Sequence, residues 1–288
     1  MRITLEDLKL DYGYVEKRII EFIRDYFEKT GVNRAVVGIS GGVDSTVTAF
    51  LTVRALGSGK VTALIMPDSK VTPSRDLEDA LKVVEILGIK KYQVDIANIL
   101  ESYRKNVPFF DANNKIALGN LRARIRMTLL YYYANLNNAL VVGTGDKSEL
   151  LIGYFTKYGD GGVDILPIGD LYKTQVRQLA IHLGIPKDIA EKPSSPALWP
   201  GQTAEGELGM SYSEVDLVLY SFFDRKIEMS RIPQVTGVDE WKVKAILERV
   251  SKTSHKRNMP PIPKISGRTL GADLIMPQYF SIEEIGEF

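Results

Sequence analysis

The chain has 288 residues, of which 44% are hydrophobic and 25% charged, values that are typical of one large globular domain. Its formal net charge of +1 provides no overall attraction to nucleic acid or to anionic lipid, so we expect neither as a partner. Cysteine is absent, which excludes disulfides, cysteine metal sites and a cysteine nucleophile within this chain. Neither an apolar leader nor an 18-residue apolar run is present, so the sequence predicts a cytoplasmic protein without a membrane segment.

The first elements in chain order are an entry helix and a strand-rich region. Apolar residues at helical spacing predict a helix over residues 5–29, which Gly31 ends. Short runs rich in β-branched residues then alternate with helical patterns, which is typical of a parallel sheet with helices on both faces. We therefore predict an α/β fold with a doubly wound, parallel, five-stranded sheet. Four of the strands are assigned to residues 34–40, 60–66, 91–96 and 139–144.

Helical periodicity continues through the rest of the chain. It predicts helices over residues 43–56, 73–88, 96–106, 119–136, 170–183, 212–223 and 239–257. The turn-rich stretches 67–75 and 191–211 are candidate lids, because long loops in compact domains usually cover or bind ligands. We assign residues 1–263 to a single α/β domain and residues 264–288 to a C-terminal tail of different character.

The stretch GISGGVDS at residues 38–45, which we call the glycine-rich loop, connects the first strand to a helix, where open parallel sheets bind ligands. Gly41 and Gly42 let the backbone approach an anion closely, and the free amides of the helix that begins near Val43 face it. Ser40 and Ser45 add hydroxyl donors. The loop therefore predicts a phosphate site, although it contains no lysine.

Asp44 places a carboxylate in this loop, and it would repel a polyphosphate unless a cation lies between them. Magnesium takes one or two carboxylates beside phosphate oxygens, and Glu149, which follows another strand end, is the candidate for the second ligand. Two simpler interpretations remain open. Asp44 can be a first-turn acid that complements the helix dipole, and Asp146 with Glu149 can form a capping box.

Two basic features also have alternative interpretations. Lys173 falls in the first turn of a helix for which Asp170 is the expected N-cap, and a cation there opposes the helix dipole. A nearby anion would remove this conflict, and so would solvation at the surface. Arg122 and Arg126 share one face of a helix, which we interpret as a solvated basic face, whereas Arg124 points nearly opposite.

The string SGGVDS resembles the pyrophosphate-binding loop of the N-type ATP pyrophosphatases, which cleave ATP to AMP and pyrophosphate. The strings GNLRARIRM, GTGDKSE, YFTKYGDGGVD, PIGDLYKTQV, LGMSY and HKR make residues 8–262 similar to one family of that superfamily, the ammonia-dependent NAD synthetases. The resemblance implies an adenine nucleotide α-hydrolase-like, Rossmann-like fold. It also implies a ligase of NAD biosynthesis that acts as a homodimer, with its dinucleotide substrate near the interface.

The resemblance also implies roles for individual positions. Asp44 and Glu149 would hold Mg²⁺, and Asp44, Lys173 and Asp164 would serve catalysis, Asp164 by accepting a proton from ammonium. ATP is the implied co-substrate, bound by Gly38, Ile39, Ser40, Gly41, Gly42, Val43, Asp44, Ser45, Thr144, Lys173 and Ser195. The second substrate, nicotinic acid adenine dinucleotide (deamido-NAD), would contact Arg124, Lys157, Asp164, His255 and Lys256.

The implied reaction adenylates the nicotinate carboxylate with release of pyrophosphate, and ammonia then displaces AMP to give NAD. Ammonia would come from solution or from a separate glutaminase, since the chain has neither a cysteine nor room for a glutaminase domain. Two other functions stay open. One is another N-type ATP pyrophosphatase, GMP-synthetase-like or tRNA-modifying, and the other is a non-catalytic adenine-nucleotide-binding module.

Overall fold

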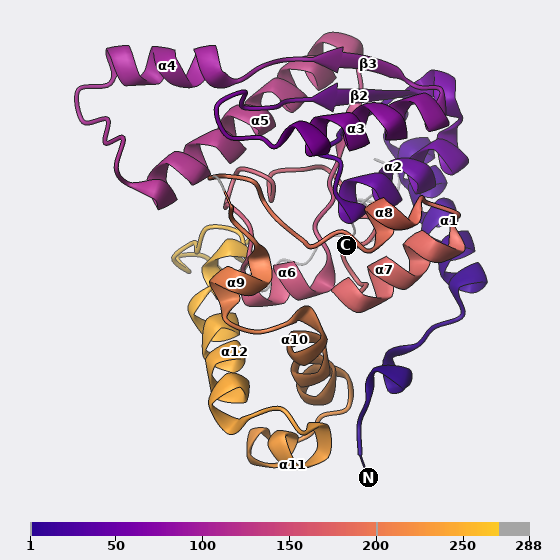
Figure 1. Ribbon diagram of the computed structural model, residues 1–288, viewed down its shortest axis with the longest axis vertical. Coiled ribbons are helices and arrows are strands. Elements are labelled where there is room, and N and C mark those ends of the chain that lie inside the picture. The colour runs from indigo at the N-terminus through magenta and orange to yellow at the C-terminus, as the bar shows by residue number, and fades with distance from the viewer. Residues whose placement is uncertain (1, 200, 271–288) are drawn as a thin grey trace.

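A computed structural model describes residues 2–199 and 201–270 of the chain (Figure 1). Most of the predicted tail, residues 271–288, lies outside the described residues. Pro200, inside the predicted lid 191–211, also lies outside them. Within the described ranges, no helix has the length and apolar character that crossing a membrane requires.

Four short parallel strands form the sheet, in the spatial order β3-β2-β1-β4. Their bounds are β1 Ala35–Gly38, β2 Val61–Ile65, β3 Lys90–Gln93 and β4 Leu140–Val142. Ala35 pairs with Val61 on one side and with Leu140 on the other. The strand order therefore reverses beside β1, and in open parallel sheets the crevice at such a point binds ligands.

The prediction of five strands is wrong by one strand. Ile165 makes an isolated parallel bridge to Val142 beside β4. Pro167 has no N–H with which to extend the ladder, and the chain turns at once, Gly169 N–H donating to Leu166 O at 3.0 Å. A fifth strand thus starts beside β4 but ends after one residue pair.

Helices cover both faces of the sheet (Figure 1). Alternate strand residues point to opposite faces, so Val37 of β1 joins one core cluster and Val36 joins another. The first cluster includes side chains of α1 (Tyr12–Thr30), α2 (Val43–Leu56), α3 (Ser74–Leu87), α7 (Lys173–His182) and α8 (Lys187–Ala190). The second includes side chains of α4 (Ala97–Asn106) and α5 (Lys115–Asn137).

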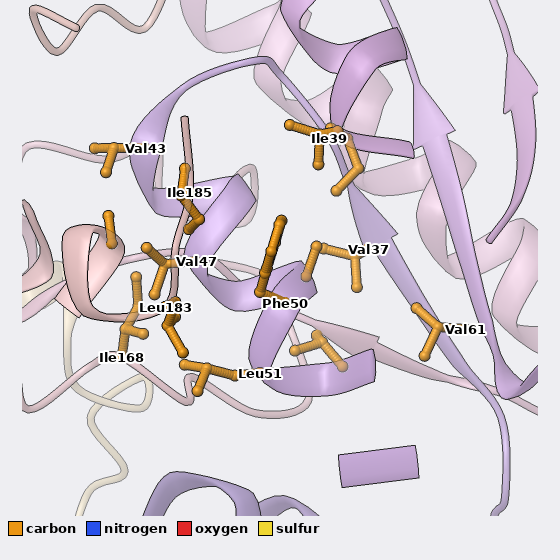
Figure 2. Close-up of a cluster of buried hydrophobic side chains, with 14 of the residues drawn as sticks. Val37, Ile39, Val43, Val47, Phe50, Leu51, Val61, Ile168, Leu183 and Ile185 are labelled. Carbon is orange, nitrogen blue, oxygen red and sulfur yellow. The ribbon is translucent and has the colours of Figure 1, made fainter. Parts of the chain in front are cut away.

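Helix α2, which follows the glycine-rich loop, is buried on nearly all sides. Almost all residues from 43 to 52 are inaccessible to solvent. Figure 2 shows Phe50 directed toward Val37 of β1, and Val47 directed away from the sheet toward Leu183. This enclosure holds the start of α2, and with it the glycine-rich loop, against the sheet.

A third core cluster forms a lobe that joins the sheet through α6 (Lys147–Ile152), the helix that follows β4. The lobe contains α10 (Tyr212–Leu219), α11 (Ile232–Thr236) and α12 (Glu240–Lys252), which lie below α6 and α7 in Figure 1. The predicted lid 191–211 contains the short helix α9 (Ala204–Leu208).

Several helix boundaries differ from the prediction, and the predicted helix 239–257 is α-helical only over α12. The predicted helix 5–29 consists of a 3-10 turn, Leu5–Leu8, and then α1, whose N-cap Asp11 accepts Tyr14 N–H at 3.1 Å. The predicted helix 212–223 is α-helical only to the end of α10 and continues as a π-helical turn, Tyr220–Asp224. Capping and local winding, which periodicity does not report, cause these differences.

Candidate active site

A cavity of about 590 Å³ lies at the carboxyl end of the sheet. Its lining includes the glycine-rich loop and the ends of β2 and β4. Other walls come from residues 153–160, from the segment 192–207, and from Arg249 and Lys256. Open parallel sheets hold nucleotides at this position.

Close packing determines the shape of the glycine-rich loop. Gly41 has a φ of +79°, in the left-handed region, and a Cβ there would lie 2.2 Å from the carbonyl oxygen of Asp76 in α3. Only glycine fits this position. Gly42 is the N-cap of α2 and provides no side-chain cap, which leaves the first amides of the helix suited to an anion. Ser45 Oγ donates to Gly42 O at 3.1 Å and closes the turn.

The ammonium of Lys173 joins three carboxylates. Its Nζ lies 2.7 Å from Asp44, 2.9 Å from Asp146 and 2.8 Å from Glu149. Lys173 and Asp146 are fully buried, whereas Asp44 and Glu149 keep one side open to the cavity. Burial opposes the charged form of Lys173, but the three carboxylates outweigh it and raise the pKa of this lysine well above its usual value. The ammonium therefore stays charged.

Burial acts on the acids as well. It raises the pKa of Asp146, and it raises the pKa of Glu149 well above its usual value, because a carboxylate loses solvation inside the protein. Lys173 counteracts this effect, while the neighbouring acids add to it. Three acids that face one ammonium favour the binding of a further cation.

These acids fit a divalent cation that binds together with phosphates. Asp44 Oδ1 is buried and has no hydrogen-bond partner, and oxygen ligands are those that Mg²⁺ prefers. Among residues 2–199 and 201–270, no cluster of three acidic, histidine or cysteine side chains forms a ready metal site. Mg²⁺ needs only one or two carboxylates when phosphate and water supply its other ligands, so Asp44 and Glu149 suffice.

The simpler interpretations of these acids hold only in part. Asp146 caps α6, since its Oδ1 accepts Glu149 N–H at 2.8 Å. The capping box is incomplete, because the Glu149 carboxylate turns to Lys173 instead of returning to the N-cap backbone. Asp170 is not the N-cap of α7, which starts after Tyr172, and its side chain is exposed. Protein carboxylates therefore balance the cation in the first turn of α7.

The residues predicted to bind ATP come together at this cavity. All of them line it except Gly41, which lies within the loop, and Lys173, which lies behind Asp44. Thr144 follows β4, and Ser195 Oγ donates to the backbone of the segment 191–211 at 2.6 Å. Three segments that are distant in the sequence thus form one wall.

The residues predicted to contact deamido-NAD do not share this cavity. Of the five, only Lys256 lines it, and its ammonium donates to two backbone carbonyls, each at 2.7 Å. Arg124 and His255 are exposed. Arg124 donates to the Lys157 carbonyl at 3.3 Å, so these two residues lie side by side.

Asp164 also lies outside the cavity lining. Its Oδ2 accepts Val141 N–H at 2.7 Å, and its Oδ1 accepts the Tyr131 hydroxyl at 3.0 Å. Asp160, four residues earlier, lines the cavity and accepts Thr156 N–H at 2.8 Å. Of these two acids, Asp160 is therefore the one that the cavity exposes to a ligand.

The interpretation of Arg122 and Arg126 as a solvated basic face is wrong. Arg122 Nε lies 2.7 Å from Asp68 Oδ2, and both side chains are buried. Arg126 Nε donates to Met66 O at 2.9 Å, and Arg126 lines the cavity. Met66 directly follows β2 and Asp68 lies two residues further on, and helical spacing gives no indication of either partner.

Other residues of the cavity were not predicted. The Tyr154 hydroxyl donates to Glu207 at 2.8 Å, and the Arg249 guanidinium lies 5.7 Å from the Tyr154 ring centroid. Lys192, at the base of the segment 191–211, lies 2.6 Å from a carboxylate oxygen of Asp76 in α3. No pattern in the sequence marks these residues as a group.

Comparison with known proteins assigns the chain to a family. The model of the NAD synthase family matches residues 15–260. The chain belongs to the NAD synthase family. The NH(3)-dependent NAD(+) synthetase of Staphylothermus marinus is 58% identical, over 92% of this chain and 96% of that protein. The enzyme of the same name from Hyperthermus butylicus is 56% identical, over 91% of this chain and 95% of its own length.

Solved structures share the fold of this NAD synthase family member. NMN synthetase from Francisella tularensis matches with a TM-score of 0.79 and 33% identity, over 89% of this chain and 100% of that one. NH3-dependent NAD synthetase from Campylobacter jejuni, solved with a nitrate ion, matches with a TM-score of 0.75 and 32% identity over the same shares. The two neighbours are named for different products, so the fold alone does not identify the substrate.

Proposed function

We propose that this member of the NAD synthase family is an NH₃-dependent NAD⁺ synthetase. It would convert deamido-NAD, ATP and ammonia to NAD, AMP and pyrophosphate, the last step of NAD biosynthesis. The observation that carries the proposal is the cavity wall on which the glycine-rich loop, Asp44 and Glu149 meet, with Lys173 behind the two acids. A loop that suits phosphates beside two acids that suit Mg²⁺ fits the cleavage of ATP. The relatives at 58% and 56% identity bear this same name.

The chain's own residues would bind and orient the reactants. The nicotinate carboxylate attacks the α-phosphorus of ATP, while the first amides of α2 hold the departing pyrophosphate. Lys173, behind Asp44, holds the Asp44 and Glu149 carboxylates in place at the cavity. Asp44 and Glu149 would hold Mg²⁺, which supplies Lewis-acid stabilisation of the phosphates when bound. Loss of one preorganised donor of this kind typically lowers the rate ~10²–10³-fold.

The acyl adenylate reacts with water as well as with ammonia, so the cavity must exclude solvent. We assign this task to the segments 67–75 and 191–211. Arriving ammonium must also lose a proton, and Asp164 is the proposed acceptor. Each of its oxygens accepts one hydrogen bond, from Tyr131 and from Val141, and keeps a second lone pair for such a proton.

Exposed residues outside the cavity suit a substrate bound between two copies of the chain. Arg124 and His255 are exposed, and α5 also exposes Tyr132 and Leu136, large side chains that a second copy would remove from water. We therefore propose a cytoplasmic homodimer with deamido-NAD near the interface, supplied with ammonia from solution or by a separate glutaminase. Sedimentation velocity measures this state, and a monomer during turnover would contradict it.

The test is the release of pyrophosphate from ATP in the presence of Mg²⁺ and ammonia. Release is expected with deamido-NAD, together with NAD, and more slowly with nicotinic acid mononucleotide. Release that does not depend on deamido-NAD would overturn the proposal. Release with xanthosine monophosphate or tRNA would favour another N-type pyrophosphatase, and ATP binding without release would favour a non-catalytic module.

A further inference from the structure

Helix α7, which carries Lys173, caps only its N-cap residue by itself: Gln175 Oε1 accepts Tyr172 N–H at 2.8 Å. Its N-cap residue, Tyr172, provides no side-chain cap. The first two amides of α7 are capped from other helices: Lys173 N–H donates to Ser148 Oγ at 2.9 Å, and Thr174 N–H donates to Asp216 Oδ2 at 2.8 Å. A buried helix start needs such partners, because an unpaired amide away from water is costly.

Asp216 of α10 connects the starts of two helices. Its Oδ1 accepts the Ser148 hydroxyl at 2.5 Å, while its Oδ2 accepts the amide in α7. Ser148 lies in the first turn of α6, next to Glu149. One carboxylate thus holds together the two helices that place Glu149 and Lys173 opposite each other.

This arrangement costs stability. Asp216 is fully buried, and its two oxygens accept hydrogen bonds from a hydroxyl and an amide. Both donors are neutral, and a buried carboxylate without a cationic partner is destabilising. Burial raises its pKa to about 7. Asp216 does not line the cavity, and apolar residues such as Val215 and Leu219 already pack α10 into the third core cluster. Packing alone therefore does not explain an acid at this position.

We propose that Asp216 is a positioning residue for nucleotide binding, which aligns α7 with α6 so that the Lys173 ammonium stays beside Asp44 and Glu149. The inference rests on the proposed function, in which Lys173 and the two acids serve Mg·ATP. In its ionised form, Asp216 also places negative oxygens at both helix N-termini, which complements the two helix dipoles in this one orientation. Asparagine at position 216 has a single acceptor oxygen and can satisfy only one of the two donors.

The test is a double-mutant cycle in which isothermal titration calorimetry measures the dissociation constant of Mg·ATP. Asp216→Asn is expected to weaken binding about tenfold in the otherwise unchanged chain. In the Lys173→Met background the same substitution is expected to change binding less than about twofold, because the side chain that Asp216 aligns is gone. Glu214→Gln is the matched control, the same chemical change on the same helix. Glu214 pairs with Lys242 at 2.5 Å and accepts Ser211 N–H at 2.9 Å at the start of α10, and glutamine can still accept this hydrogen bond, so the substitution should leave binding unchanged.

Equal weakening in both backgrounds would overturn the inference, because a general loss of stability does not depend on Lys173. Unchanged binding by Asp216→Asn with Lys173 present would also overturn it. Ser148→Ala provides a second route if Asp216→Asn does not fold: it removes the link to the Lys173 amide and should show the same dependence on Lys173. Unchanged binding by Lys173→Met alone would overturn the nucleotide role of Lys173, and this inference with it, without any variant of Asp216.

Discussion

The two groups of predicted site residues differ in how much of their environment the chain itself supplies. The inner group, the glycine-rich loop with Glu149 and Lys173, is held by ion pairs of 2.7 and 2.8 Å and by the enclosed helix α2. The outer group consists of Arg124, Lys157, Asp164 and His255 and lies outside the cavity lining. A preorganised group needs little ordering when a ligand binds. In the outer group Asp164 is held in the same way by Val141 and Tyr131, whereas Arg124 and His255 are exposed and have more freedom to lose on binding.

The largest effect is expected from removing the acids of the inner group. The double substitution Asp44→Ala, Glu149→Ala should abolish Mg²⁺-dependent ATP binding and lower pyrophosphate release more than ~10³-fold, because no open carboxylate remains beside Lys173. Calorimetry with and without Mg²⁺ measures the binding. Asp170→Ala, which removes an exposed acid, is the control and should change neither quantity. Unchanged Mg²⁺-dependent binding would contradict the metal assignment and favour the simpler interpretation, in which Asp44 and Glu149 stabilise the starts of their helices.

A smaller and different effect is expected in the outer group. Asp164→Asn should lower ammonia-dependent turnover ~10²-fold, the range typical of a lost proton acceptor, and should leave the affinity for ATP unchanged. Asparagine can still accept Val141 N–H, so the fold should persist. Steady-state rates at varied ammonia concentration measure the effect. Normal turnover would contradict the catalytic assignment, and Asp164 would then have only a structural role, through its hydrogen bond from Val141 of β4.

The smallest effect concerns the buried support of the inner group. The raised pKa of Asp216, about 7 against a usual 3.8, means that the folded chain keeps a proton that the unfolded chain has released between pH 4 and 7. The free energy of unfolding from this group therefore falls as pH rises through that window, by at most ~1.4 kcal/mol per pH unit, and levels off above it.

Asp216→Asn lacks this titration, so its stability relative to the unchanged chain should rise from pH 5 to pH 7. Urea unfolding at pH 5, 6, 7 and 8 measures the difference. Glu214→Gln should show no such rise, because its hydrogen bond from Lys242 helps to lower the pKa of Glu214, although burial opposes this. Parallel stability profiles for Asp216→Asn and the unchanged chain would contradict the prediction.

The hydrophobic pattern of the sequence predicted which helices and strands form better than it predicted where they end or how many strands pair. The four assigned strands are confirmed, although β3 starts one residue before its predicted range and ends earlier. Helices α6 and α9, of six and five residues, are too short to show a helical period. A fifth strand does not extend beyond Ile165, because Pro167 has no N–H to donate to the sheet, and this proline is visible in the sequence.

The site was predictable where a residue conflicted with its local surroundings. Lys173 opposes the dipole of α7, and of the two alternatives that the sequence left open, a nearby anion and surface solvation, the structure shows the anion. Asp146 caps α6, as local pattern suggests, but its second role beside Lys173 depends on where α7 lies. The partner of Arg122 lies after β2, on another element, so only the fold brings the pair together. The local sequence thus shows that a residue such as Lys173 needs a partner, whereas which residue becomes the partner depends on the folded arrangement of the elements.

The ion pair between Arg122 and Asp68 has a mechanical consequence for the segment 67–75. Asp68 N–H donates to Thr72 Oγ1 at 2.9 Å, and Asp68 O accepts Val71 N–H at 2.9 Å, so this turn closes on itself while Arg122 fastens it to α5. Displacing this turn would break a buried ion pair, which is costly because it leaves both charges without a partner. We therefore expect the segment 67–75 to keep its place when reactants bind, and the base of the segment 191–211 is tied to its end through the ion pair between Lys192 and Asp76.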